Sequence, residues 1–377
     1  MTLRIPSADL TAVYRRYQAE FDEAVSRVLW SGRYVLGDEV EAFEAEFADA
    51  LGVSHVVSVA NGTDAVELSL RAAGVPPGGR VVTVSHTAVA TVAAVARAGA
   101  VPVMVDIDPV TYTMSPDALA QVLEGAEQVA AVVPVHLYGY PADMEAIGRL
   151  AAEAGALVVE DAAQAHGATT GGRAAGALGT AGAFSFYPTK NLGAFGDAGA
   201  VATGDDSLAQ RLAELRQYGW RRRVSETEGM NSRLDELQAA VLRVRLRHLT
   251  EETAHRRTLA RIYDEALDGL PIARPPAPDP DRGVDPVYHQ YVVGLPPGSR
   301  PGVQAVLSER GIGSAIHYPV PVHLQPAYSH LATPGGMAVT ESVCGNILSL
   351  PIGPHVDEGQ VVEVASAVGI AIAASRS

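Results

Sequence analysis

Short apolar runs alternate with segments of helical periodicity through the first half of the chain. Each apolar run spans only a few residues, as the buried strands of a parallel sheet do. The runs cover residues 56–60, 81–84, 101–105, 130–135, 157–159 and 183–186. The helical segments between them cover residues 65–73, 89–98, 116–123 and 144–154. This alternation predicts βαβ units and an α/β fold with a mainly parallel sheet.

The second half of the chain carries a different pattern. Residues 234–270 keep a helical pattern without proline, which predicts a long helix that connects two lobes. The proline-rich residues 271–286 predict a loop, and a strand at 288–293 and helices at 302–310 and 356–374 follow it. We therefore expect a large domain over residues 1–250, N-terminal segment included. A small C-terminal α/β domain, with the linking helix, is expected over residues 251–377.

Composition narrows the class of protein. Of the 377 residues, 47% are hydrophobic and 19% are charged, so the chain can bury a large core. A net charge of −15 disfavours nucleic acid and anionic membranes as partners. Cys344 is the single cysteine, which excludes an intrachain disulfide and suits a reducing compartment. Neither a signal-peptide core nor an apolar run of transmembrane length is present, so we expect a cytoplasmic protein.

Lys190 is the only lysine among 28 basic residues. Arginine serves solubility and ion pairing equally well, but it cannot lose its proton and cannot condense with an aldehyde. A lysine amine can do both once its pKa is lowered. The pattern favours a covalent catalytic role for Lys190 over the survival of one surface lysine by chance.

Asp161 stands at the end of the apolar run 157–159, where a parallel strand delivers side chains to a ligand site. A carboxylate buried there needs a cationic partner. A protonated pyridine nitrogen would supply one, and a Schiff-base lysine with an acidic partner is typical of pyridoxal phosphate enzymes. The alternative for Asp161 is a helix N-cap after the strand.

Phosphate-binding groups can be found at two further positions. Gly62 and Thr63 lie where a predicted strand gives way to a helix, whose free N–H groups suit a phosphate, although such a pair can also be a simple cap. Ser185 offers a second hydroxyl near the lysine. The glycines after Lys190 lack the dinucleotide-binding spacing, and the histidines lack zinc-site spacing, so we expect no metal.

Five ordered segments carry a specific resemblance that covers nearly the whole chain. They begin at Asn61 (Asn-Gly-Thr-Asp-Ala), Glu160 (Glu-Asp-Ala-Ala-Gln-Ala-His-Gly), Phe184 (Phe-Ser-Phe-Tyr-Pro-Thr-Lys-Asn-Leu-Gly), Asn231 (Asn-Ser-Arg-Leu-Asp-Glu-Leu-Gln-Ala-Ala) and His317 (His-Tyr-Pro-Val-Pro-Val-His-Leu-Gln-Pro-Ala-Tyr). The chain resembles the DegT/DnrJ/EryC1/StrS nucleotide-sugar aminotransferases. The resemblance implies the aspartate-aminotransferase-like fold (fold type I), with a seven-stranded sheet in the large lobe and a smaller C-terminal lobe.

The resemblance also implies roles for single residues. Lys190 would carry pyridoxal phosphate as a Schiff base, and Asp161 would pair with the ring nitrogen. The remaining cofactor contacts would be Gln164 at the phenolic oxygen, Gly62, Thr63 and Ser185 at the phosphate, and Asn231 at the phosphate from the second subunit of a homodimer. An amino acid, which we expect to be glutamate, would leave its nitrogen on the cofactor as pyridoxamine phosphate, and a nucleotide-linked keto sugar would accept it.

One position departs from the family pattern. Ala88 stands where relatives commonly carry an aromatic residue that stacks on the cofactor. Either His86 or a residue elsewhere covers that ring face, or the stacking is weaker in this chain. Residues that border the sugar pocket in relatives match Tyr187, Tyr218, His317 and His323.

Two other functions can be compared with aminotransfer. Related sugar dehydratases carry histidine in place of the lysine, whereas this chain keeps Lys190. A non-catalytic cofactor-binding regulator would need a DNA-binding module or a basic face, for which the length and the net charge of this chain leave no room. Within the aminotransferases, tyrosine at position 187 resembles enzymes for 3-keto-6-deoxy sugars, while many 4-keto enzymes carry histidine. The sequence thus favours a dTDP-linked 3-keto-6-deoxyhexose over its 4-keto isomer. Arg221, Arg222 and Arg223 can serve the diphosphate or form a solvated loop.

Overall fold

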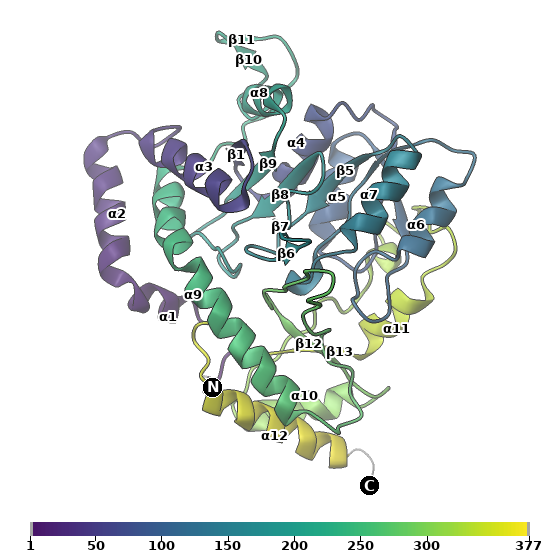
Figure 1. The fold of residues 1–377 in the computed structure, drawn as a ribbon. Helices are drawn as coiled ribbons and strands as arrows, with labels where there is room; N and C mark the ends of the chain where they lie inside the picture. Colours follow the sequence, from purple (N-terminus) through teal and green to yellow (C-terminus); the bar gives the residue numbers. More distant parts are fainter. Residues whose placement is uncertain (1–2, 375–377) are drawn as a thin grey trace.

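A seven-stranded sheet organises the larger part of the protein, for which the computed structural model describes residues 3–374 (Figure 1). In spatial order the strands are β1 (His55–Val59), β9 (Gly199–Thr203), β8 (Ala181–Ser185), β5 (Leu157–Asp161), β4 (Val129–Val132), β2 (Arg80–Val84) and β3 (Val101–Val105). β9 is antiparallel to both neighbours, and the other pairs are parallel. The α/β class and the mainly parallel sheet are therefore confirmed. β9 was not predicted, because its Gly-Ala-Val-Ala-Thr sequence has few large apolar side chains.

Helices cover both faces of this sheet because successive side chains of a strand point to opposite faces. Val57 of β1 and Val81 of β2 pack in one cluster with α4 (Gly62–Ala72), α5 (Val89–Arg97) and α8 (Asp206–Leu215). Val56 packs on the other face with α3 (Asp38–Leu51) and α9 (Glu236–Ala266). Farther along that face, Val82 packs with α6 (Pro116–Leu123) and α7 (Met144–Glu153). The sheet edge at the C-terminal ends of the parallel strands is thereby left to loops.

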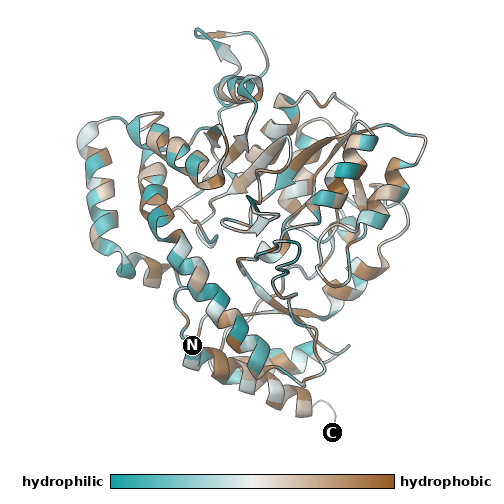
Figure 2. Ribbon diagram, in the orientation of Figure 1, coloured by the Kyte–Doolittle hydropathy of each residue, from teal (hydrophilic) through white to brown (hydrophobic). Residues whose placement is uncertain are grey.

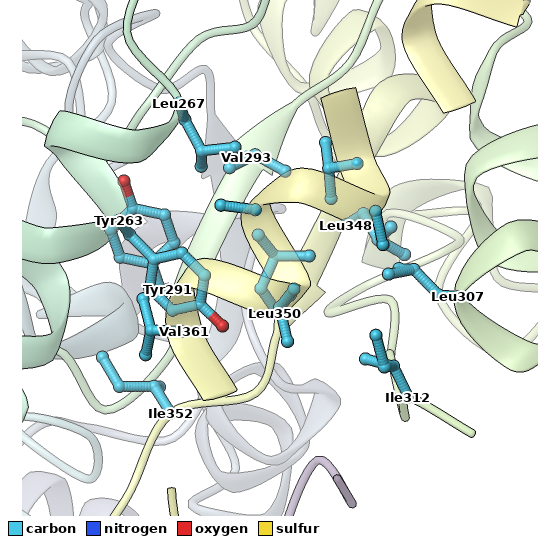
Figure 3. Packing of buried hydrophobic residues seen from close by; sticks show 14 of the residues in the cluster. Tyr263, Leu267, Tyr291, Val293, Leu307, Ile312, Leu348, Leu350, Ile352 and Val361 are labelled. Atoms are coloured by element: carbon cyan, nitrogen blue, oxygen red, sulfur yellow. The ribbon is translucent and has the colours of Figure 1, made fainter. Parts of the chain in front are cut away.

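A second core lies in the C-terminal part of the chain. Here α9, α10 (Arg300–Glu309) and α12 (Glu358–Ala374) pack around the antiparallel pair β12 (Tyr291–Gly294) and β13 (Ile347–Leu350). The rings of Tyr263 and Tyr291 stack at its centre with centroids 4.5 Å apart (Figure 3). Figure 2 shows that α12 is largely hydrophobic, in keeping with the buried side chains that it contributes to this core.

The long helix α9 joins the two cores. Ala239, near its start, packs with the sheet, whereas Leu259, near its end, packs in the C-terminal core. The domain boundary predicted at residue 250 falls inside this helix. Ile5 also belongs to the C-terminal core, and its N–H donates a hydrogen bond to the Gly311 carbonyl at 3.1 Å. The division into domains of residues 1–250 and 251–377 therefore remains a prediction.

Several peripheral elements complete the molecule. α1 (Leu10–Arg16) and α2 (Gln18–Ser31) lie beside α9, and α11 (Ala338–Asn346) precedes β13. The short hairpin of β10 (Trp220–Arg221) and β11 (Val224–Ser225) stands away from the body beyond α8 (Figure 1). Among residues 3–374 no helix combines the length and the apolar character needed to cross a bilayer.

Candidate active site

A cavity of about 330 Å³ lies at the C-terminal ends of the parallel strands. The start of α4, the end of β5 and the segment that follows β8 supply most of its wall. This is where an open α/β sheet receives its ligand. The cavity brings together seven of the predicted site residues, namely Gly62, Thr63, Asp161, Gln164, Ser185, Tyr187 and Lys190.

The start of α4 forms a site for an anion. Asn61 caps the helix, and its Oδ1 accepts a hydrogen bond from the Asp64 N–H at 2.8 Å. The N–H groups of Gly62 and Thr63 then belong to the first turn, which has no intrahelical partners. A Cβ on residue 62 would lie 2.5 Å from Cβ of Ser185, so only glycine allows the helix to approach β8 this closely. Two N–H groups, two hydroxyls and the helix dipole together suit a phosphate.

Asp161 is a buried carboxylate, only 6% exposed. Its Oδ2 accepts a hydrogen bond from the Thr91 hydroxyl at 2.7 Å, and its Oδ1 accepts one from the Ala163 N–H at 3.2 Å. Thr91 is held in turn by Thr87 at 2.9 Å. No arginine, lysine or histidine of the described chain lies within ion-pair distance of Asp161, and no α-helix follows it for the side chain to cap. A buried carboxylate of this kind fits a cationic group of a ligand, such as a protonated ring nitrogen.

Lys190 lies in the loop between β8 and β9. Two backbone hydrogen bonds of 2.8 Å fix this loop, from the Phe186 N–H to the Ala198 carbonyl and from the Ala194 N–H to the Phe186 carbonyl. Burial lowers the pKa of Lys190 to about 8, against the opposing effect of the Asp161 charge. A lysine with this pKa is partly neutral near physiological pH, so it can act as a nucleophile and a base. These surroundings do not suit a chance surface lysine.

Gln164 is held with its amide at the cavity wall. Its Oε1 accepts a hydrogen bond from the Tyr138 N–H at 2.6 Å, and its Nε2 donates one to the Tyr318 hydroxyl at 3.1 Å. No residue within 3–374 accepts the second Nε2 proton, so it is available to an oxygen of a ligand. The cavity therefore suits pyridoxal phosphate: α4 and Ser185 would hold the phosphate, Asp161 would meet the ring nitrogen, and Lys190 would meet the aldehyde.

Comparisons with known proteins agree with this geometry. The DegT/DnrJ/EryC1/StrS aminotransferase family matches residues 15–369. The chain belongs to this family. A dTDP-3-amino-3,4,6-trideoxy-alpha-D-glucose transaminase of Streptomyces venezuelae is 49% identical over 369 residues, which cover 97% of this chain and 96% of that protein. The crystal structure of S. venezuelae DesV with a ketimine intermediate superposes with a TM-score of 0.92 at 47% identity, over 97% of this chain and 98% of that one.

Family membership confirms three predictions. The chain is a pyridoxal-phosphate-dependent aminotransferase, its fold is that of these enzymes, and the cofactor is the one that the cavity fits. The prediction of an enzyme is thereby confirmed against the alternative of a non-catalytic regulator. Lys190 is also intact, unlike in the sugar dehydratases related to this family.

His86 lies outside the cavity, whereas Ala88 lines it. His86 is completely buried, its Nε2 is 2.7 Å from the Tyr138 hydroxyl, and its Nδ1 is 3.2 Å from Sγ of Cys344. Burial lowers the pKa of His86 to about 4. Among the described residues that line the cavity, Tyr187 is the only aromatic one. Position 88, where relatives commonly carry the aromatic ring that stacks on the cofactor, therefore presents only the methyl group of Ala88 to the cavity.

The other predicted substrate residues are dispersed. His317 pairs through Nδ1 with the Ser349 hydroxyl at 2.9 Å and lines a different cavity, and His323 pairs with Ser85 at 2.7 Å. The ring of Tyr218 lies tilted against that of Trp220 in the projecting hairpin, with centroids 5.1 Å apart. Asn231 is exposed and, like Tyr218, lies outside the cofactor cavity of its own chain.

Sequence reasoning missed the groups that hold the site residues in place. Thr91, in the first turn of α5, and Thr87, just before that helix, fix Asp161, while Tyr138 and Tyr318 fix Gln164. Nothing in the sequence indicated which carboxylate the Thr91 hydroxyl meets, because the contact spans 70 positions.

Proposed function

We propose that this enzyme transfers an amino group from glutamate to a nucleotide-linked keto-deoxysugar, with dTDP-3-keto-6-deoxyhexose as the acceptor. The observation that carries the proposal is the cavity in which Lys190, Asp161 and the α4 phosphate site meet. The relative of 49% identity, a dTDP-3-amino-sugar transaminase, supports the choice of substrate. The product would be an aminodeoxysugar nucleotide of the kind used in antibiotic biosynthesis.

The polar groups of the cavity would divide the work of this reaction. Pyridoxal phosphate, when bound, supplies an aldehyde for the amino group and a ring that accepts the electron pair of the reacting carbon. Gly62, Thr63 and Ser185 hold its phosphate, and the Asp161 carboxylate stabilises positive charge at its ring nitrogen. Lys190, whose pKa of about 8 lets it release and regain a proton near neutral pH, takes the proton from the donor carbon. It then delivers a proton to the carbon of the acceptor.

Tyr187 is the residue on which the choice of ketone position rests. Its side chain is 51% exposed and lines the cofactor cavity three residues before Lys190. A hydroxyl in that position can bind a sugar hydroxyl and thereby select which ring carbon faces the lysine, since a shift by one carbon moves the ketone out of reach. The alternative is a 4-aminotransferase acting on the dTDP-4-keto-6-deoxyhexose.

The experiment is to incubate the purified enzyme with glutamate and either the 3-keto or the 4-keto dTDP-6-deoxyhexose. We expect NMR of the product to place nitrogen on C3, with far less turnover of the 4-keto isomer. Nitrogen on C4, with no reaction of the 3-keto isomer, would reverse the choice. Absence of an amino sugar from both substrates would reject the proposed acceptor class.

We further propose that the enzyme works in the cytoplasm as a homodimer with shared sites. Asn231 and Tyr218, which lie outside the cofactor cavity of their own chain, would then serve the partner's site. Subunit exchange between a Lys190→Ala chain and an Asn231→Ala chain should create one intact site in each mixed dimer and restore activity. Activity that stays at the level of the separate variants after exchange would contradict shared sites.

A further inference from the structure

A second cavity, of about 240 Å³, meets the cofactor cavity at Lys190. Its wall comes from the loop that carries Lys190, from α9, from the C-terminal lobe and from the N-terminal segment around Ser7. That segment is pinned over the cavity, since the Gly313 N–H donates to the Ile5 carbonyl at 2.8 Å and His355 Nε2 lies 3.0 Å from the Pro6 carbonyl.

Two buried guanidinium groups of α9 line this second cavity. Arg245 is 4% exposed and Arg256 is 7% exposed, and both retain donors that no described residue accepts. Arg245 uses only Nη2, at 3.0 Å to the Asn191 carbonyl and at 2.8 Å to Glu252. Arg256 uses only Nη1, which donates to backbone carbonyls, the shortest contact being 3.1 Å to Tyr288. The Nε atoms of both arginines are buried without a partner.

The two guanidinium groups are not matched by carboxylates. Glu252 pairs with Arg245, whereas Asp9, the carboxylate that lines the cavity, accepts the Ala12 N–H as the cap of α1, and no carboxylate of the described residues lies within ion-pair distance of Arg256. Burial, together with the like charge of Arg245, lowers the pKa of Arg256 to about 10. Buried guanidinium donors without acceptors are costly, and an anionic ligand would satisfy them.

The rest of the cavity wall includes histidines and hydroxyl groups, which can form hydrogen bonds to an anion. His289 and His317 both line the cavity, and burial, with the nearby charge of Lys190, holds the pKa of each below its ordinary value. Ser349 adds a hydroxyl that is 2.9 Å from His317 Nδ1. Cavities for drug-sized ligands run from about 300 to 1,000 Å³. A volume of about 240 Å³ therefore suits a small anion better than a whole nucleotide sugar.

We propose that this second cavity binds a carboxylate of the amino-acid donor. The inference rests on the proposed function, because it assigns the donor and the sugar to opposite sides of Lys190. The donor amine must reach the cofactor aldehyde at this lysine, and its carboxylate would then extend toward Arg245 and Arg256. A keto sugar has no carboxylate, so it would use only the open side near Tyr187. One catalytic lysine can thus serve two chemically different substrates.

The test measures binding of succinate, a dicarboxylate that lacks an amino group, to the holoenzyme by calorimetry. Arg245→Gln combined with Glu252→Gln removes both charges of the ion pair, so neither partner is left buried without the other. Ala315→Leu fills the cavity from the C-terminal lobe without touching either arginine. Arg247→Gln is the matched control, because Arg247 lies on the same helix and pairs with Glu20 at the surface.

We expect each cavity variant to weaken succinate binding by roughly tenfold or more, as loss of a charged hydrogen bond or of ligand space does. The kcat/KM for glutamate should fall by a similar factor, while kcat/KM for the keto sugar changes less than about twofold, because the two substrates react in separate half-reactions. Arg247→Gln should change neither quantity.

Unchanged succinate affinity in Ala315→Leu or in the double variant would overturn the inference. So would inorganic phosphate or dTDP that competes with succinate at equal or higher affinity in the unmodified enzyme, since the cavity would then be a phosphate site. Failure of the proposed function looks different. The enzyme would convert no nucleotide-linked keto sugar, while succinate would still bind and still depend on Arg245.

Discussion

The cavity around Asp161 takes most of its polar groups from the ends of helices and strands, whereas the cavity around Arg245 and Arg256 takes its two guanidinium groups from the interior of one helix. Gly62, Thr63 and Asp161 each lie at the boundary of an element of the sheet layer. The arginines lie inside α9, and their cavity is completed by residues as distant in sequence as Ser7 and Ser349. The first cavity is therefore a property of the sheet edge, and the second a property of the contact between lobes.

Lys190 belongs to both cavities, so its replacement should have the largest effect. Lys190→Ala should lower the rate of both half-reactions by about 10⁴-fold or more, since the same amine forms the covalent link and moves the proton. The variant should still bind some cofactor through Asp161 and the phosphate site. Single-turnover assays with glutamate and with the keto sugar give the two rates, and borohydride reduction of the native enzyme should attach the cofactor to Lys190.

Lys190→Arg is the matched control, because it restores the positive charge but not the nucleophile. It should be as inactive as the alanine variant. Near-normal transamination by either variant would refute the assignment of Lys190.

Asp161 lines the cofactor cavity only, yet both half-reactions would use the cofactor ring with which we propose that it pairs. Asp161→Asn keeps the size of the side chain but removes the charge, and loss of a buried charge partner corresponds to about 10²–10³-fold in rate. We expect the rates of the half-reactions with glutamate and with the keto sugar to fall by the same factor. The control is Asp206→Asn, at an exposed residue of α8, which should leave both rates unchanged. A loss confined to one substrate would place Asp161 in substrate binding instead.

Gly62→Ala tests the close approach of α4 to β8. The new Cβ would meet Cβ of Ser185 at 2.5 Å, so the phosphate site must open. We expect cofactor affinity to fall by roughly 10–100-fold, the range for losing one or two charge-assisted hydrogen bonds. Fluorescence titration of the cofactor-free protein with pyridoxal phosphate measures this affinity. Gly148→Ala is the control, because Gly148 lies within α7 and a Cβ there meets no atom within 4 Å.

The last prediction concerns the pH dependence of cofactor capture. Because burial lowers the pKa of Lys190 to about 8, the neutral amine becomes scarce only below that pH. Capture of added pyridoxal phosphate by the cofactor-free protein should therefore slow by about tenfold for each pH unit well below 8 and level off above it. Stopped-flow absorbance from pH 6 to 10 follows the rate. A rate that still rises steeply between pH 9 and 10 would indicate an unperturbed lysine.

The sequence by itself determined much of the large lobe and of the cofactor cavity. Short apolar runs separated by helical periodicity are local patterns, and they predicted six of the strands in the sheet. Parallel strands present their C-terminal ends at one edge, so Asp161 and the residues after β1 and β8 could be expected to meet there. The single lysine and its neighbouring motif identified the chemistry.

Only the tertiary structure decided which distant side chains complete each site. Thr91 reaches Asp161 across 70 positions of sequence, and His86 turns toward Tyr138 and Cys344 instead of the cofactor cavity. Arg245 and Arg256 follow a helical pattern that is equally compatible with a solvated face. Their role depends on the N-terminal segment and the C-terminal lobe closing over α9. A local pattern fixes the direction of a side chain within its own element, but the partner it meets depends on how the elements pack.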